Sequence, residues 1–214
     1  MTLALSSDEL LSTTRAVRHR LDLTRPVARQ LLEECVDLAV QAPTGRNRRR
    51  RHFVIVTDPQ RRAALADLWR AGVNTPGASA PVPLRDLRRA DVAHMDRVFS
   101  GAAHLYEHLQ EVPALVVPCV EGRTDEAPVL HQAGTWGSIL PAVWSFMLAA
   151  RAHGLGTCWT TGNLVHEKQT ARFLGIPCSE VMQTALIPVA YTLGTDFRPA
   201  RRIPREEVLH WDEW

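Results

Sequence analysis

This 214-residue chain has arginines near both of its ends that could bind an anion. Arg15 and Arg18 lie near the start, and Arg201 and Arg202 lie near the finish. A guanidinium group meets a phosphate or a carboxylate with paired hydrogen-bond donors. Exposed basic turns are also common and often have no ligand. Taken alone, these residues leave both anion binding and a solvated surface open.

Two histidines have a spacing that metal sites use. His104 and His108 lie four residues apart on one face of a predicted helix, with Glu107 and Glu111 beside them. No third ligand is evident, so we predict an ordinary polar helix face and no metal site. The sequence also lacks a Gly-x-Ser-x-Gly elbow, a phosphate loop, and a Gly-x-Gly-x-x-Gly segment after a strand.

The composition is typical of one soluble globular domain, which we place over residues 1–214. Hydrophobic residues make up 45% and charged residues 22%, which excludes a disordered or fibrous chain. The formal net charge of +2 excludes a nucleic-acid binder that works through overall charge. The four cysteines form no Cys-x-x-Cys pair and are predicted to be buried, reduced thiols. No secretory leader or membrane span is evident, so we expect a cytoplasmic protein.

Helices and strands alternate along the predicted chain, with Gly, Pro and polar clusters between them. The segment 71–90 has no periodicity and is predicted to be a lid loop. The helix at 137–153 is apolar almost all round and is predicted to be buried on every side. The tail from residue 194 is predicted to be extended. The predicted helices are 24–42, 61–70, 91–111, 137–153 and 165–174, and the predicted strands are 52–58, 113–120, 157–161 and 184–193.

Four segments in order resemble the family of FMN-dependent nitroreductases, and the resemblance covers nearly the whole chain. They are residues 14–18 (TRAVR), 42–47 (APTGRN), 154–159 (GLGTCW), and the tail 199–204 with 206–211. The resemblance implies an α/β (α+β) three-layer sandwich with a mixed central sheet flanked by helices. It also implies a homodimer with a swapped C-terminal tail and two FMN sites at the interface.

The resemblance also assigns residues to the FMN phosphate. Arg15 is expected at the phosphate, and Arg18 at the phosphate or at the ring edge, where a cation stabilises anionic reduced flavin. Ala16 replaces the family's serine, which leaves only a backbone N–H at that position. Arg202 matches the C-terminal phosphate-binding residue, and Arg201 is a substitute for the preceding one.

Further segments are expected at the flavin ring. Pro43, Thr44 and Asn47 lie in the turn that meets its polar edges. Ser138, Ile139 and Leu140 are expected against it, with backbone amides at the start of the 137–153 helix as donors. Trp144 stands where relatives have glutamine and is predicted to pack in the core. Two groups complete these expectations: the remaining flavin contacts Thr160, Thr161 and Gly162, and the dimer anchors Trp211 and Trp214.

The arginine cluster of residues 46 and 48–51 departs from the family pattern. It could bind nucleic acid, but it precedes a predicted core strand and lacks interleaved aromatic residues. It could instead lie at the mouth of the flavin pocket and bind the 2′-phosphate of NADPH or an anionic substrate. A solvated basic loop is equally plausible. We predict no nucleic-acid binding and leave the other two interpretations open.

The implied function is ping-pong oxidoreduction. NAD(P)H binds transiently over the flavin and is replaced by a small electron-poor acceptor such as a nitroaromatic or a quinone. Because the flavin performs this chemistry, we name no protein side chain as catalytic. Two alternatives remain: a flavin-dependent dehydrogenase, dehalogenase or desaturase with a specialised substrate, and a flavin-sequestering or nucleotide-binding protein without turnover.

Overall fold

The computed structural model describes residues 2–47, 49–78 and 92–214. Most of the predicted lid lies outside these residues. Of its described part, residues 71–73 form the last turn of a helix rather than a loop, and residues 74–78 are a turn.

One sheet forms the middle layer. Its strands are β1 (Arg51–Val56), β2 (Ala114–Glu121), β3 (Leu155–Thr157), β4 (Val181–Gln183) and β5 (Ile187–Tyr191). The order is β1-β2-β5-β3, and β4 also pairs with β2. These pairs are antiparallel, with Arg51 opposite Val120 and Leu155 opposite Tyr191. A parallel component comes from the isolated bridge between Ala16 and Thr157.

Side chains of β2 alternate between the two faces of the sheet, as expected for a strand covered on both sides. Val116 and Val120 pack in a cluster with Phe146. Leu115 and Val117 pack in a second cluster on the opposite face. Both clusters are buried, which confirms the three-layer sandwich.

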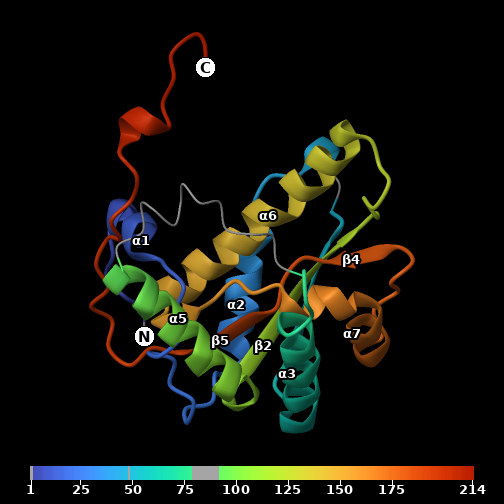
Figure 1. The fold of residues 1–214 in the computed structure, drawn as a ribbon, viewed down its shortest axis with the longest axis horizontal. Coiled ribbons are helices and arrows are strands. Elements are labelled where there is room, and N and C mark those ends of the chain that lie inside the picture. Colours follow the sequence, from blue (N-terminus) through green and yellow to red (C-terminus); the bar gives the residue numbers. More distant parts are fainter. Residues whose placement is uncertain (1, 48, 79–91) are drawn as a thin grey trace.

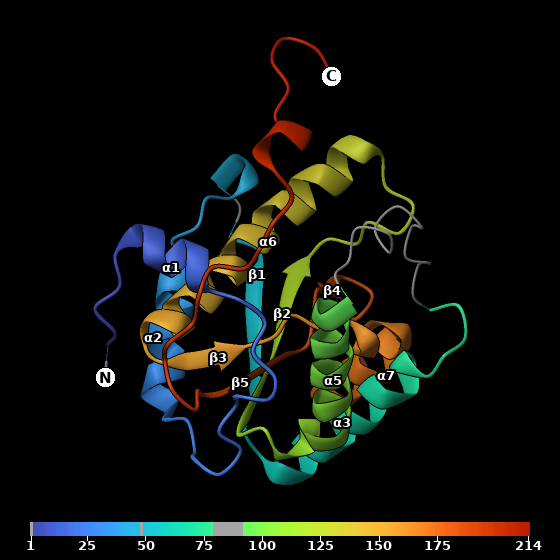
Figure 2. The ribbon, with the colours of Figure 1, turned by 60° about the vertical axis from the view of Figure 1, so that its left-hand side comes forward.

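Helices cover both faces (Figures 1 and 2). On one side lie α1 (Ser7–Thr13), α2 (Arg29–Ala39) and α6 (Val129–Ala152). On the other lie α3 (Pro59–Val73), α5 (Val92–His108) and α7 (Glu167–Leu174). Short 3₁₀ turns link them: η1 (Gly45–Asn47), η2 (Leu109–Glu111), η3 (Gly162–His166) and, in the tail, η4 (Arg205–Glu207).

Helix α6 differs from its prediction in two respects. It begins at Val129, eight residues earlier than predicted, with Pro128 as its N-cap. It is also not buried on every side of this single chain: Leu140 is 39% exposed and Trp144 40%. The prediction that Trp144 packs in the core is therefore wrong. The helix is long and apolar enough to cross a membrane, but 44% of that window is buried inside the protein, as in a core helix.

Other boundaries shift for local reasons. Helix α2 starts at Arg29, because Thr24 hydrogen-bonds the side chain of Asp22 in a turn and Pro26 disfavours helix in the residue before it. The predicted last strand at 184–193 is shortened to β5, because Leu186 forms an isolated bridge with Thr160, and β4 lies before the predicted strand. The predicted strand at 157–161 ends at Thr157.

The C-terminal tail leaves the body of the protein and ends far from it (Figure 1). Residues 201–214 are all exposed, including Trp211 at 78% and Trp214 at 101%. The predicted extended tail is confirmed, whereas its exchange between subunits remains a prediction. Three cysteines are buried and Cys178 is half-buried, and all four are free thiols.

Candidate functional site

The N-terminal arginine segment lies along the end of β3. The N–H of Val17 donates to the carbonyl oxygen of Thr157 at 2.8 Å, and Ala16 bridges the same residue. The side chain of Arg18 packs on Gly101 of α5 and hydrogen-bonds the thiol of Cys158. Burial raises the pKa of that thiol, and the Arg18 guanidinium opposes the shift. Two segments that are far apart in the sequence are thus joined.

Residues 160–162 lead from the end of β3 into η3. The N–H of Thr160 donates to the carbonyl oxygen of Leu186 at 3.2 Å, and the return bond is 2.8 Å. Thr161 precedes η3 and is exposed. Gly162 packs against Gly72 of α3 so closely that neither position has room for a β-carbon. Thr160, Thr161 and Gly162 are therefore held in a fixed position beside the arginine segment.

The tail begins beside the same arginine segment. The guanidinium Nη1 of Arg15 donates to the carbonyl oxygen of Arg198 at 3.2 Å. Arg202 follows four residues later, which limits it to about 14 Å from Arg198. Arg201 and Arg202 are exposed, and within the described ranges no ion pair joins Arg15, Arg18 or either of these to a carboxylate. Arg15 is thus brought to the root of the tail that carries Arg201 and Arg202.

A second group of predicted site residues forms around α6. The N–H of Gly45 donates to the hydroxyl of Ser138 at 3.1 Å, which ties the 43–47 turn to the helix. Asn47 has a positive φ of 53°, a left-handed conformation that asparagine tolerates better than most residues. Among the described residues, no hydrogen bond connects this second group to the arginine segment.

The reason given for the 138–140 contacts needs correction. Because α6 begins at Val129, these residues lie in the helix interior, where their amides bond to preceding carbonyls. Ile139 is fully buried in the core, while Leu140 on the next position is exposed. Ser138 is the member of this trio whose polar side chain contacts the turn.

A cavity of about 520 Å³ lies next to this turn. Gly45 and Arg50 line one side, Glu121 at the end of β2 another, and His131 and Ser138 of α6 a third. Glu121 is also paired with His52 at 3.0 Å. The volume is within the range that small-molecule sites use. Sequence reasoning missed this cavity, because His131 and Glu121 have no signal that places them near Gly45.

The arginine cluster divides between two roles. Arg51 donates to the carbonyl oxygens of Ala42 and Val40, both at 2.9 Å, and so caps the C-terminal end of α2. Burial lowers the pKa of Arg51. Arg50 lines the cavity, and Arg49 is exposed. Arg48 lies outside the described residues. Neither anion binding at the pocket mouth nor a solvated basic loop therefore accounts for the whole cluster, because Arg51 has a structural role.

Comparison with known proteins identifies the fold's family. A model of the nitroreductase family matches residues 11–191, which is most of the chain. The chain belongs to the nitroreductase family. Its members are flavin-dependent oxidoreductases in general.

Solved structures share this fold at low identity. A variant of the FMN and NADPH-dependent nitroreductase NfnB from Sphigopyxis sp. strain HMH has a TM-score of 0.73 and 20% identity, over 98% of this chain and 100% of that one. A BluB-like flavoprotein from Clostridium difficile 630 has a TM-score of 0.70 and 16% identity, over 98% and 100%. Iodotyrosine deiodinase, bound to FMN and 3-iodo-L-tyrosine, has a TM-score of 0.68 and 21% identity, over 95% and 97%.

In this nitroreductase-family chain a third histidine, His19, lies beside His104 of the spaced pair His104 and His108. The rings of His19 and His104 are 4.5 Å apart between centroids, and those of His104 and His108 are 4.6 Å apart. Burial lowers the pKa of His104, and the charges of His19 and His108 lower it further. Within the described residues no group of three or more His, Cys, Asp and Glu side chains could hold a metal ion. The rings form a row rather than a ligand set.

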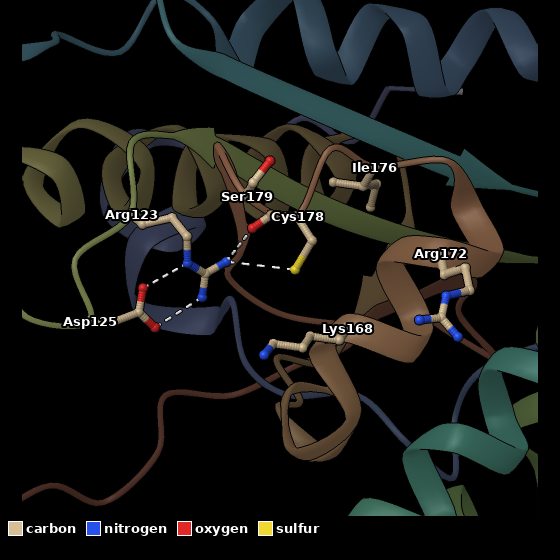
Figure 3. Close-up of a pocket in the computed structure, with 7 residues that line it drawn as sticks. All are labelled: Arg123, Asp125, Lys168, Arg172, Ile176, Cys178 and Ser179. Carbon is tan, nitrogen blue, oxygen red and sulfur yellow. Dashed lines mark hydrogen bonds and ion pairs between the residues drawn. The ribbon is translucent and has the colours of Figure 1, made fainter.

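A basic hollow of about 620 Å³ lies apart from the predicted site (Figure 3). Its most buried cation, Arg123, contacts Asp125 at 2.6 Å, Glu167 at 2.9 Å, and the carbonyl oxygen of Cys178 at 2.7 Å. These two carboxylates neutralise Arg123 and leave it no free donor direction. Arg123 therefore acts as a tie between the loop after β2 and α7 rather than as an anion ligand.

Proposed function

We propose that this protein is a cytoplasmic, homodimeric FMN-dependent NAD(P)H oxidoreductase that reduces an electron-poor small molecule such as a nitroaromatic or a quinone. Membership of the nitroreductase family supports the class of enzyme. One neighbour in fold is described as FMN and NADPH-dependent and another as FMN-bound. The observation that carries the proposal is the meeting of the Arg15–Arg18 segment, residues 160–162 and the root of the tail in one region.

The residues in that region fit a flavin phosphate. Arg15 contacts the tail that carries Arg201 and Arg202, and in the described part of the chain none of these residues, nor Arg18, forms an ion pair with a carboxylate. By contrast, Arg123 is neutralised by two carboxylates. A phosphate dianion is bound most strongly by guanidinium groups whose donors are not already taken by other anions. FMN, when bound, supplies hydride transfer from NAD(P)H to the acceptor.

The chain's own residues would hold and orient the cofactor. Arg15, Arg201 and Arg202 would bind the phosphate, with the backbone N–H of Ala16 as a further donor. Arg18 is fixed against Gly101 and Cys158, so its guanidinium would reach the ring edge in a constant orientation. Thr160, Thr161 and Gly162 would flank the ring from the rigid entry to η3.

The second group of site residues supports a dimeric site. Pro43, Thr44, Asn47 and Ser138 are tied to α6 and have no hydrogen bond to the arginine region in the described chain. We propose that these residues, with the exposed Leu140, approach the FMN of a second copy. The buried Ile139 would support Ser138 from the core instead of touching the cofactor.

An exposed apolar row on α6 would form the contact between copies. Leu130 is 86% exposed and Trp144 40%, with Leu140 between them at helical spacing. A row this long is rarely left in water by a monomer. Trp211 and Trp214 would be anchors of the exchanged tail, because large exposed aromatic side chains contribute strongly to interfaces. We expect Leu140→Glu to yield monomers that lose FMN, as measured by light scattering and flavin absorbance.

The decisive experiment is an absorbance spectrum of the purified protein followed by anaerobic titration with NADPH. The proposal predicts a flavin spectrum that NADPH bleaches and that a quinone or nitroaromatic restores. A protein that stays colourless after FMN is added would overturn the oxidoreductase function. Bound FMN that NADPH does not bleach would indicate a different electron donor or a sequestering protein.

The position of the phosphate is tested by two arginine variants. We expect Arg202→Ala to weaken FMN binding by about tenfold or more, because a charge-assisted bond to phosphate is lost. Arg50→Ala serves as the matched control and should change FMN binding by less than about threefold, since Arg50 lines the other cavity. The reverse order would mean that the phosphate lies at the 46–51 cluster.

A further inference from the structure

A phenylalanine at the root of the tail contacts two guanidinium groups through its ring. The Cζ atom of Arg20 is 4.2 Å from the centroid of the Phe197 ring, and the Cζ atom of Arg151 is 4.7 Å from it. Cations at this distance from a ring are attracted to its electron-rich face, and more strongly where water is excluded. Phe197 is half-buried and also packs on the core cluster of Leu21 and Leu65. We name Arg20, Phe197 and Arg151 the tail clamp.

Arg20 also fixes the backbone that leads to Phe197. Its Nε donates to the carbonyl oxygen of Leu193 at 2.8 Å, and its Nη2 contacts Asp196 at 2.6 Å. Its own carbonyl oxygen accepts from the N–H of Leu193 at 2.8 Å. Gly194 has a φ of +75°, and a β-carbon there would lie 2.7 Å from Arg20 Nη2. Glycine is therefore required at residue 194, because its φ is positive and a β-carbon there would clash with Arg20.

Arg151 is an unusual residue for the end of a core helix. It is only 4% exposed, and its Nη2 donates to the carbonyl oxygen of Thr195 at 3.0 Å. Its Nε and Nη1 have no hydrogen-bond partner, and none of the described carboxylates forms an ion pair with it. Burial lowers the pKa of Arg151, and the nearby charge of Arg20 lowers it further. A buried guanidinium without a counter-ion destabilises a fold relative to an apolar side chain of similar size. The role of Arg151 is therefore better explained by what it holds than by fold stability.

The clamp is the last well-anchored part of the chain before the proposed phosphate ligands. One further bond, from Arg15 Nη1 to the carbonyl oxygen of Arg198, follows it. Residues 201–214 are then all exposed. Arg202 lies five residues beyond Phe197, so the clamp confines it to within about 18 Å of the ring. A tail released at Phe197 would spread Arg202 over a much larger volume and lower its effective concentration at the phosphate.

We propose that Arg20, Phe197 and Arg151 are positioning residues for cofactor binding: the clamp directs the tail so that Arg201 and Arg202 reach the FMN phosphate next to Arg15. This inference rests on the proposed function, because it assumes that Arg202 binds that phosphate. None of the three clamp residues touches the cofactor. The clamp acts only through the arginines of the tail.

A double-mutant cycle tests the inference. The variants are Phe197→Leu, Arg202→Ala and the double variant, with Arg198→Ala as the matched control because only its backbone carbonyl is used. The dissociation constant of FMN is measured by quenching of flavin fluorescence. We expect Phe197→Leu to weaken FMN binding by about three- to tenfold in the wild-type background and by less than about twofold in the Arg202→Ala background. Arg198→Ala should leave FMN binding within about twofold of wild type.

The outcomes separate the two proposals. If Arg202→Ala binds FMN as tightly as wild type, the phosphate assignment is wrong, and the clamp inference falls with it. If Arg202→Ala weakens binding but Phe197→Leu has no effect, or the same effect in both backgrounds, only the clamp inference is overturned. Should Phe197→Leu fail to fold, Arg151→Met replaces it in the cycle, because methionine keeps the buried stem and removes the charge. The same non-additivity with Arg202→Ala is then required.

Discussion

Gly72 and Gly162 make the closest backbone contact between α3 and the candidate FMN site. A β-carbon on Gly72 would fall on the carbonyl oxygen of Gly162, far inside 3.0 Å, and 2.8 Å from its carbonyl carbon. Both partners are backbone, so no side chain can rotate away. We therefore predict that Gly72→Ala separates α3 from η3.

The size of the effect follows from two opposing terms. Alanine stabilises a helix interior by about 1 kcal/mol relative to glycine. Overpacking typically costs about 1–3 kcal/mol when side chains can adjust, and more when the backbone must move. Here an ordinary contact of 3.4 Å can be restored only by a shift of backbone that also carries Trp69 and Val165. We take this backbone shift to cost about 3–4 kcal/mol, which, after the gain of about 1 kcal/mol, leaves a net loss of about 2–3 kcal/mol in the free energy of unfolding.

The measurement is denaturant unfolding of wild type, Gly72→Ala and Gly134→Ala at one protein concentration, since assembly would otherwise shift apparent stability. Gly134 is the matched control, because it is also helical and a β-carbon there meets nothing within 4 Å. Gly134→Ala should be neutral or stabilising by up to about 1 kcal/mol. If Gly72→Ala is as stable as wild type, the close approach of α3 and η3 is wrong.

Two further predictions concern polar side chains. Arg51→Ala should lower the free energy of unfolding by about 1.5–3 kcal/mol, because it leaves two carbonyl oxygens at the end of α2 without their donor. The control Arg49→Ala should change that free energy by less than about 0.5 kcal/mol. Equal effects of the two variants in chemical unfolding would contradict the capping role. Burial, and then the charges of His19 and His108, hold the pKa of His104 below its usual 6.5, whereas Glu107 and Glu111 oppose the shift. The unfolded chain therefore takes up this proton first, so the contribution of His104 to stability is complete above pH 6.5 and declines as the pH falls below it. Thermal unfolding between about pH 7.5 and 5.5 should show this decline in wild type and a smaller one in His104→Gln, and identical profiles would refute it.

The sandwich was predictable because each of its layers has a local signal. The run 113–120 is apolar throughout, as a strand covered on both faces must be, and β2 has that burial. The beginning of α6 was not predictable in the same way. Gly134 weakens the helical pattern over residues 129–136, and packing in the folded protein overrides that local preference.

Apolar character also does not distinguish a core from an interface. Ile139 and Leu140 are neighbours of equal hydrophobicity, but Ile139 is fully buried and Leu140 is 39% exposed. Only the helix phase relative to the sheet decides between them, and that phase is a tertiary property. The third histidine was missed for a related reason: His19 and His104 are 85 positions apart, and no periodic pattern spans that separation.

The role of each arginine follows from the partner that its guanidinium meets in the folded chain. Arg51 meets helix carbonyls, Arg123 meets two carboxylates, and Arg151 meets an aromatic ring. A mobile anion gains little from such residues, because their donors or their charge are already engaged. Arg15 and Arg202 have no carboxylate partner within the described chain, and Arg15 contacts the tail at Arg198, four residues before Arg202. We therefore expect an anion to bind where the Arg15 segment meets the root of the tail, although the 46–51 segment is the denser basic cluster in the sequence.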